Sequence, residues 1–346
     1  MYSYLHHAFL CDTLRWHPSY NDWACINFLG IYAHLDFTQA SVPANFDVGD
    51  SLVRDPSSGK CGPSLLPYFR RQQPLLQVDV LERSEVWGTN AALSLISGTA
   101  RGRRSMMLYA DKTQLGLSAA AKEPVVHQVM FSRADDEGTV LVHGFDVSGK
   151  YGARRVQTGA AAEACQVPVG PVAHRQAVYV LKPDATARWL ASPETVRQRL
   201  EAALAGQGMT SFGGDQGSGE PGLVFGLDAT SAINDHGLEM LSGSLPIDIR
   251  PLHVQMEHKQ GLARTFGLLA SRGRLDHDAA LERHLEGLVR AAEALRFFML
   301  RCAAGHTPKD AASWWTSSVR ELMLHEASAY RSLLRGLAAR QHGAVR

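Results

Sequence analysis

Apolar and polar positions alternate in several short runs through the middle of the chain. Such runs, bounded by turn residues, are typical of β-strands that bury one face. They predict strands at 75–81, 104–110, 125–133, 139–147 and 176–182. Between 125–133 and 139–147 lies Ala-Asp-Asp-Glu-Gly, a short polar connection that ends in glycine. This pair is therefore the clearest antiparallel hairpin in the sequence.

Apolar residues at helical spacing dominate both ends of the chain. This spacing predicts helices at 2–14, 22–36, 193–205, 276–301 and from Thr307 onward. Ser192 can cap the third of these with Pro193 at the first helical position, and Thr307 with Asp310 forms a capping box. We expect an α+β fold with N-terminal helices, a central mixed or antiparallel sheet that contains the hairpin, and a helical C-terminal region.

Two segments rich in turn residues interrupt this pattern. Residues 37–63 contain many Pro, Gly, Ser and Asp residues and predict a long loop with short extended pieces. Residues 206–222 carry seven glycines in seventeen positions, and ordering such a chain costs much backbone entropy. We therefore expect an α+β domain at 1–205, a glycine-rich loop or linker at 206–222, and a mainly helical region at 223–346 that can pack on the first as one unit.

Composition narrows the class of protein without identifying its chemistry. The chain has 346 residues, 45% of them hydrophobic, and a net charge of +1, so we expect a folded protein that needs no polyanionic partner. Its five cysteines are scattered without a C-x-x-C pair, which argues against a disulfide framework or a zinc cluster. The N-terminus lacks the features of a signal peptide, and no apolar stretch is long enough to span a membrane. We expect an intracellular setting with no membrane partner.

Nucleotide and metal sites are not indicated. The segment at 57–62 superficially resembles a phosphate-binding loop, but Arg54 stands where glycine is needed and Cys61 where a magnesium-binding hydroxyl is needed. His253 and His258 lie five residues apart, a spacing that splays two histidines on a helix. We therefore expect no cofactor and no metal.

Cys25 is the residue best placed to act as a nucleophile. If Asp22 caps its helix, Cys25 lies in the first turn, where the helix dipole lowers the pKa of a thiol. A cysteine nucleophile also needs a base, and His127 at the start of the hairpin can supply one. Cys61 is an alternative thiol. The alternative without chemistry is that Cys25 is a core residue of an apolar helix.

The register of the hairpin decides whether a third residue joins this pair. If Arg133 faces Val140, His127 lies opposite Asp146, whose carboxylate can orient the imidazole. A shift of one residue would send the two side chains to opposite faces. A cysteine on an N-terminal helix, followed by a histidine and an aspartate on adjacent strands, is similar to the order in papain-like cysteine hydrolases, although the family's C-G-[SA]-C-[WY] motif is absent. The resemblance implies hydrolase or acyl transferase activity, with Asn21 completing the oxyanion hole.

Arginines suggest a further interpretation, contact with nucleic acid. Two groups of arginines are candidates for contacting phosphates: Arg101, Arg103 and Arg104 in one group, and Arg331, Arg335 and Arg340 in the other. The second group also fits a solvated helix end whose cations complement the helix dipole.

The leading hypothesis is a non-enzymatic structural protein that self-assembles, of the shell- or capsid-forming kind found in virus-like particles. No complete catalytic motif is present, and the long loops at 37–63 and 206–222 can reach neighbouring subunits. Aromatic residues and a majority of arginine among the cations, 28 of 35, are favoured at interfaces. The expected partners are copies of the chain itself or other subunits of an assembly. The cysteine hydrolase and the nucleic-acid-binding protein are the alternatives.

Overall fold

The fold was analysed in a computed structural model of the chain. The structure describes residues 5–35, 45–48, 52–54, 61–63, 74–101, 104–119, 122–133, 138–146, 150–170, 173–207, 223–276 and 278–343. The chain separates into two compact units: Met1–Tyr20 with Leu65–Arg188, and Asn21–Ser64 with Trp189–Arg346. The units thus interleave along the sequence, whereas its pattern predicts one boundary within 206–222, of which 208–222 lie outside the described residues. The predicted α+β class is confirmed.

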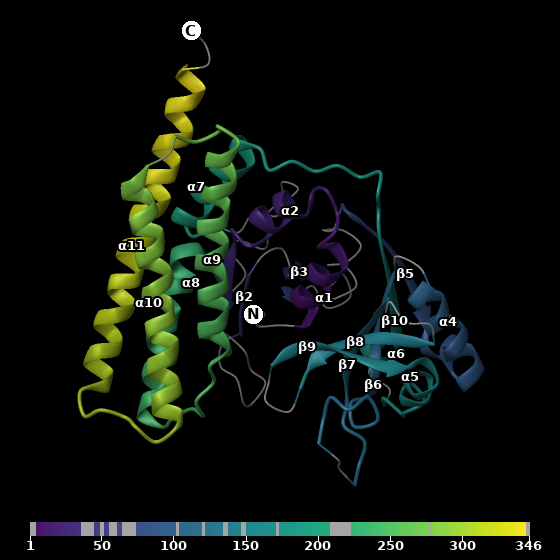
Figure 1. Cartoon of the computed structure of the whole chain (residues 1–346). Helices are drawn as coiled ribbons and strands as arrows, with labels where there is room; N and C mark the ends of the chain where they lie inside the picture. The colour runs from purple at the N-terminus through teal and green to yellow at the C-terminus, as the bar shows by residue number, and fades with distance from the viewer. Residues whose placement is uncertain are drawn as a thin grey trace. The chain divides into compact units, whose positions relative to one another are not determined.

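A six-stranded antiparallel sheet forms the centre of the first unit (Figure 1). Its order is β5-β10-β6-β7-β8-β9. The strands are β5 (Leu76–Glu82), β6 (Ser105–Asp111), β7 (Val126–Arg133), β8 (Thr139–Phe145), β9 (Tyr151–Gln157) and β10 (Ala177–Pro183). Five of these coincide with predicted strands. The edge strand β9 does not, because most of its side chains are exposed and it lacks an apolar alternation.

The hairpin of β7 and β8 has the predicted register. Arg133 pairs with Val140, and the ladder continues to the pair Met130 and His143. Because side chains alternate between the faces of a strand, this register fixes which residues of the hairpin share a face. It therefore decides the composition of the site described below.

Helices cover both faces of this sheet. The helices of the first unit are α1 (Leu5–Leu14), the 3-10 turn η1 (Arg83–Val86), α4 (Thr89–Arg101), α5 (Thr158–Ala164) and α6 (Ala173–Gln176). Phe131 and Val142 belong to the wholly buried core beneath α4 and α5. Met130 and His143, one position along, point to the opposite face, where α1 contacts β7 and β8 through Thr13 and its neighbours. The polar site lies under α1.

The second unit is mainly helical. Its elements are α2 (Tyr20–Asn27), β1 (Ile31–His34), β2 (Asn45–Val48), β3 (Leu52–Arg54), β4 (Cys61–Pro63), α7 (Pro193–Leu204), β11 (Leu223–Phe225), α8 (Gly226–Ser242), α9 (Arg250–Ser271), α10 (Ala279–Ala303) and α11 (Ala311–Gly343). Helix α10 packs between α9 and α11, and α11 also packs on α8 (Figure 1). No helix in the described ranges is long and apolar enough to cross a membrane.

The sheets of this unit are small. Strand β1 pairs with β11 and with β2, and β3 pairs with β4, all antiparallel. The helix predicted over 22–36 therefore ends at Asn27, and the residues after Gly30 join a sheet instead. The tertiary pairing of Tyr32 with Phe225 overrides a local pattern that fits a helix equally well.

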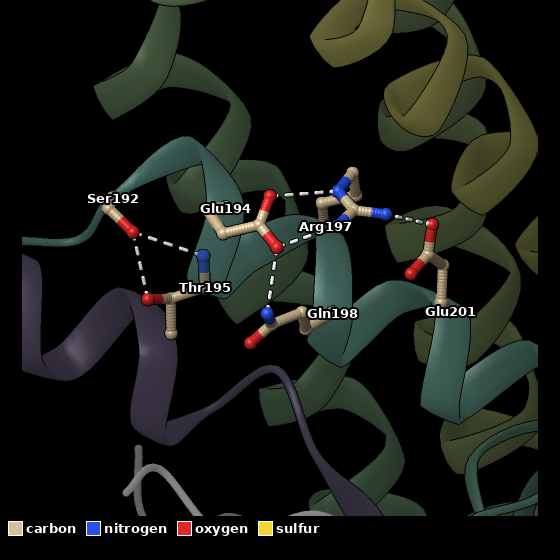
Figure 2. Close-up of polar contacts among 6 residues, drawn as sticks. All are labelled: Ser192, Glu194, Thr195, Arg197, Gln198 and Glu201. Atoms are coloured by element: carbon tan, nitrogen blue, oxygen red, sulfur yellow. Dashed lines mark hydrogen bonds and ion pairs between the residues drawn. The ribbon is translucent and has the colours of Figure 1, made fainter. Parts of the chain in front are cut away.

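Helix α7 begins as its sequence predicts. Ser192 accepts a hydrogen bond from the Thr195 backbone at 3.0 Å, and Pro193 occupies the first turn. Figure 2 shows this cap beside Arg197, which bridges Glu194 and Glu201 across one face of the helix. Because this surface is exposed, the ion pairs add little to stability, and the cap defines the start of the helix.

A buried polar cluster joins α8, α9 and α11. Lys259 and Glu326 have no solvent exposure, and their Nζ and Oε1 atoms lie 2.6 Å apart. Lys259 also donates to Thr230 at 3.2 Å and contacts Nδ1 of His258 at 3.1 Å. Tyr330 donates to Glu326 at 2.6 Å. Three side chains, those of Thr230, His258 and Tyr330, thus contact the buried lysine or its carboxylate partner.

Burial and charge together set the ionisation of this cluster. Desolvation lowers the pKa of Lys259, although Glu326 opposes the shift. Desolvation by itself would raise the pKa of Glu326, but Lys259, His258 and Tyr330 outweigh it, so the pKa falls. Burial and the neighbouring lysine lower the pKa of His258 to about 3, which leaves a neutral ring beside the ion pair. Glu326 Oε2 has no partner among the described residues.

Removing one charge of this pair should destabilise the second unit strongly. We expect Lys259→Met to lower the free energy of unfolding by about 3–5 kcal/mol, because it strands a buried carboxylate. The double variant K259M/E326Q should recover at least half of that loss, since the amide still accepts from Tyr330. Urea unfolding followed by circular dichroism measures both. The exposed pair of Arg290 and Glu286 supplies the control, because R290A should cost less than about 0.5 kcal/mol. Equal losses for K259M and R290A would contradict the expectation.

Candidate active site

Three polar side chains from α1, β7 and β8 form one hydrogen-bonded chain in the first unit. Oγ of Ser132 lies 2.6 Å from Nε2 of His143. Nδ1 of the same ring lies 2.9 Å from Oδ2 of Asp12. Both distances are in the range of strong hydrogen bonds, and each ring nitrogen has one partner in this chain. A serine, a histidine and an aspartate in this order form the arrangement that activates a serine hydroxyl in hydrolases.

The sheet register explains how two of the three residues meet. Ser132 faces Leu141 across the hairpin, and Met130 faces His143. Ser132 and His143 are thus diagonal neighbours on one face, close enough for their polar ends to meet. Asp12 arrives from α1, near the C-terminal end of that helix. Thr13 beside it donates to the sulfur of Met130 at 3.4 Å, which places the helix on this part of the sheet.

Burial differs along the chain of hydrogen bonds. His143 is 3% exposed, so its ring is held within the protein. The side chain of Asp12 is 19% exposed, and Ser132 is partly exposed. The ring is therefore shielded, whereas the residues at both ends of the arrangement are partly exposed.

Asp12 is held as an anion. Burial by itself would raise its pKa, but hydrogen bonds from His143 and Tyr151 and the charges of His143 and Arg15 more than offset this, so the pKa lies below its ordinary value. Tyr151 donates to Oδ2 at 2.6 Å, and Arg15 lies 4.0 Å from Oδ1. An ionised carboxylate on Nδ1 favours the tautomer whose Nε2 can accept the serine proton.

The residues predicted from sequence fall in both units. Cys25 lies in the second unit on α2 and is 6% exposed, whereas His127 and Asp146 lie in the first. Burial raises the pKa of Cys25, with a further contribution from Asp22, and Thr265 only partly opposes it. This direction is opposite to the one expected from a position in the first helical turn, because desolvation outweighs the dipole.

The pairing of β7 with β8 extends from Arg133 and Val140 to Met130 and His143, so it does not reach His127 or Asp146. His127 is exposed on β7 and pairs with Ala110 of β6 across the ladder. Partial desolvation lowers its pKa, and the cations Lys112 and Arg175 act in the same direction. Asp146 accepts a hydrogen bond from the Lys150 backbone at 3.0 Å. The arrangement of Cys25 with His127 and Asp146 remains a prediction.

The remaining predicted site residues are described in part. Arg104, Arg331 and Arg335 are exposed. Arg101 and Arg340 lie in α4 and α11, but their side chains lie outside the described residues, as does Arg103. Cys61 lies in β4, and its side chain is not among those described. The nucleic-acid interpretation also remains a prediction.

Sequence reasoning missed all three residues of the site. Ser132 and His143 are two of several polar positions in the hairpin strands, and the predicted register already places these two diagonally on one face. That signal was available. Asp12 is 131 residues from His143 in the chain, and no local pattern indicates that α1 packs on this hairpin.

Cys25 should resist alkylation in the folded protein. Because burial raises its thiol pKa and leaves it 6% exposed, iodoacetamide at pH 7 should leave Cys25 unmodified in native protein. The same treatment in denaturing urea should modify it fully. Peptide mapping by mass spectrometry measures both reactions. Rapid modification of Cys25 under native conditions would instead support the cysteine nucleophile.

Neither a scan against protein-family models nor a search of curated proteins found a significant match. No activity can therefore be transferred from a relative. The function has to be inferred from the geometry of Ser132, His143 and Asp12.

Proposed function

We propose that the first unit is a serine hydrolase or acyl transferase with Ser132 as its nucleophile. The observation that carries this proposal is the continuous path from Ser132 Oγ through both nitrogens of His143 to Asp12, with contacts of 2.6 and 2.9 Å. A serine hydroxyl is a weak nucleophile unless an adjacent base removes its proton. The path supplies both the base and the anion that orients it.

The residues divide the reaction between them. As Ser132 Oγ attacks a carbonyl carbon, its proton passes to Nε2 of His143, and Asp12 stabilises the imidazolium that forms. The tetrahedral adduct then collapses, the bond to the leaving group breaks, and Nε2 returns the proton to that group. Water, or another acceptor hydroxyl or amine, attacks the acyl serine in the same way. The substrate class is a carboxylic ester, thioester or amide.

Self-assembly is a second candidate, supported by an aromatic patch on the second unit. Phe297 of α10 is 63% exposed, and the adjacent Phe298 stacks on Trp314 of α11 at 4.2 Å. These residues line an open cavity of about 320 Å³ together with Arg301 and Asp310. Large exposed aromatic side chains are enriched where proteins meet. A second copy of the chain is the partner that the shell hypothesis requires.

The other hypotheses from the sequence stay open. A papain-like reaction through Cys25 needs a thiolate that burial disfavours. Nucleic-acid contact rests on exposed arginines, of which Arg331 and Arg335 lie four residues apart on α11. Exposed arginines at the end of a helix are equally consistent with a solvated surface.

A fluorophosphonate probe tests the serine hypothesis directly. Attack by Ser132 Oγ forms a bond to phosphorus and releases fluoride, with the proton passing to His143. We expect covalent labelling of the native protein at Ser132, and none after heat denaturation. His143→Ala should slow labelling about 10²- to 10⁴-fold, the usual contribution of a general base. The rate is measured by gel fluorescence and the site by mass spectrometry.

Matched variants separate this result from incidental labelling. Ser132→Ala should abolish labelling, whereas Ser94→Ala, at an exposed serine of α4, should leave the rate unchanged. Circular dichroism checks that each variant is folded. Persistent labelling of S132A, or no labelling of the folded wild-type protein, would rule out Ser132 as the nucleophile.

The oligomeric state tests the self-assembly hypothesis. Sedimentation velocity over a hundredfold range of concentration should show species larger than a monomer, and Phe297→Asp should shift them toward monomer because a charge cannot be buried at low cost. Leu190→Asp is the control, since Leu190 is equally exposed at 63% but lies apart from the aromatic patch in sequence and cavity lining. A monomeric wild-type protein at every concentration would contradict the hypothesis.

A further inference from the structure

Tyr151 holds a fixed place beside the proposed catalytic residues. Its hydroxyl donates to Oδ2 of Asp12 at 2.6 Å, the same oxygen that lies 2.9 Å from Nδ1 of His143. One carboxylate oxygen therefore serves two donors, one from β8 and one from β9. Because the two hydrogen bonds share the same lone-pair electron density, strengthening one weakens the other.

The ring of Tyr151 is fixed by aromatic neighbours. Phe145, its cross-strand partner, meets it edge-on with ring centroids 5.7 Å apart, and Phe9 of α1 lies 6.2 Å away. The ring of His143 lies 6.4 Å away on the same face. Because aromatic neighbours hold this ring in place, forming the hydrogen bond between its hydroxyl and Asp12 costs little additional conformational entropy.

The polar groups near His143 include charged side chains from two elements. Asp12 and Arg15 face the site from α1, and Tyr151 faces it from β9. Arg155 of β9, which pairs with Leu141, lies on the same face of the sheet. From β7 the contact to the ring is the hydroxyl of Ser132. Asp12 favours the protonated ring, and Tyr151 withdraws part of the negative charge that Asp12 offers.

We infer that Tyr151 is a positioning residue of this site, which orients the carboxylate of Asp12 toward Nδ1 of His143 and shares one of its oxygens with that ring. This inference rests on the proposed function. Without the tyrosine hydroxyl, Oδ2 of Asp12 would carry more charge toward Nδ1 of His143, and the imidazolium would persist to higher pH. A base that stays protonated cannot accept the proton of Ser132.

The pH dependence of fluorophosphonate labelling tests this inference. Labelling should rise with pH as the imidazole loses its proton. In Tyr151→Phe the midpoint of that rise should move upward by about one pH unit. The tyrosine hydroxyl and the imidazolium both donate to Oδ2 of Asp12, so removing the hydroxyl strengthens the bond to the imidazolium. Labelling at a pH below both midpoints should then fall by about tenfold relative to the wild-type protein.

Phe145→Leu is the matched variant. It disturbs the packing of the same ring but keeps the hydroxyl, so a purely structural role for Tyr151 would move Y151F and F145L alike. We expect F145L to keep the wild-type midpoint. Coinciding midpoints for Y151F and the wild-type protein would overturn the inference while the serine hypothesis stands.

A spectroscopic measurement makes the two failures distinguishable. In proton NMR, the Nδ1 proton of His143 should move downfield in Y151F, because its hydrogen bond to Asp12 strengthens. The experiment needs no substrate, so it can be read even if the wild-type protein does not label. An unlabelled wild-type protein rules out the serine hypothesis, and an unmoved Nδ1 resonance rules out the coupling through Tyr151.

Discussion

The hydrogen bonds of the Asp12 carboxylate organise the polar residues on the face of the large sheet that α1 covers. The carboxylate links a helix near the N-terminus to two strands whose residues lie more than 130 positions later, through His143 and Tyr151. A partly buried anion is stabilised where donors replace the hydration that it loses, and here two donors converge on one oxygen. The position of α1 on the sheet and the tautomer of the histidine therefore follow from the same contact.

In the buried cluster of the second unit, charged groups also compensate for the loss of hydration, but the whole cluster lies out of contact with solvent. Lys259 and Glu326 neutralise one another away from water, and every member of that cluster from Thr230 to Tyr330 is sealed from solvent. Polar groups enclosed in this way hold helices in register and cannot meet a substrate. In the first unit the buried histidine contacts a serine that is partly exposed, and that difference in burial is one reason why we propose chemistry at Ser132.

The sequence predicts a helix or strand correctly where its buried positions are apolar and its exposed positions are polar. Alternation placed five strands of the large sheet, and the register of its hairpin came from pairing Arg133 with Val140. The sequence predicts a mainly helical region at 223–346 but not the bounds of α9, because the buried face of this helix carries polar residues, among them Gln255 and Lys259, that interrupt the apolar periodicity. Helix α8 is also not predicted from local pattern. Its Gly237 disfavours a helix by itself, but here it is buried against the indole of Trp315, which is far away in sequence.

The site itself shows why a local pattern can supply candidates but cannot rank them. Cys25 was selected for its place in a helix, where a dipole favours the thiolate, yet desolvation and Asp22 act against ionisation. Ser132 carries no helix dipole and no recognisable motif, yet it lies on a strand bonded to its neighbour and meets a histidine whose orientation is already fixed. A nucleophile depends more on a preorganised base than on its own position, because the base determines where the proton goes as the new bond forms. Preorganisation of this kind is a property of tertiary contacts. Here those contacts come from α1, whose helix the sequence predicts but whose packing on this hairpin it does not, and from the largely exposed edge strand β9.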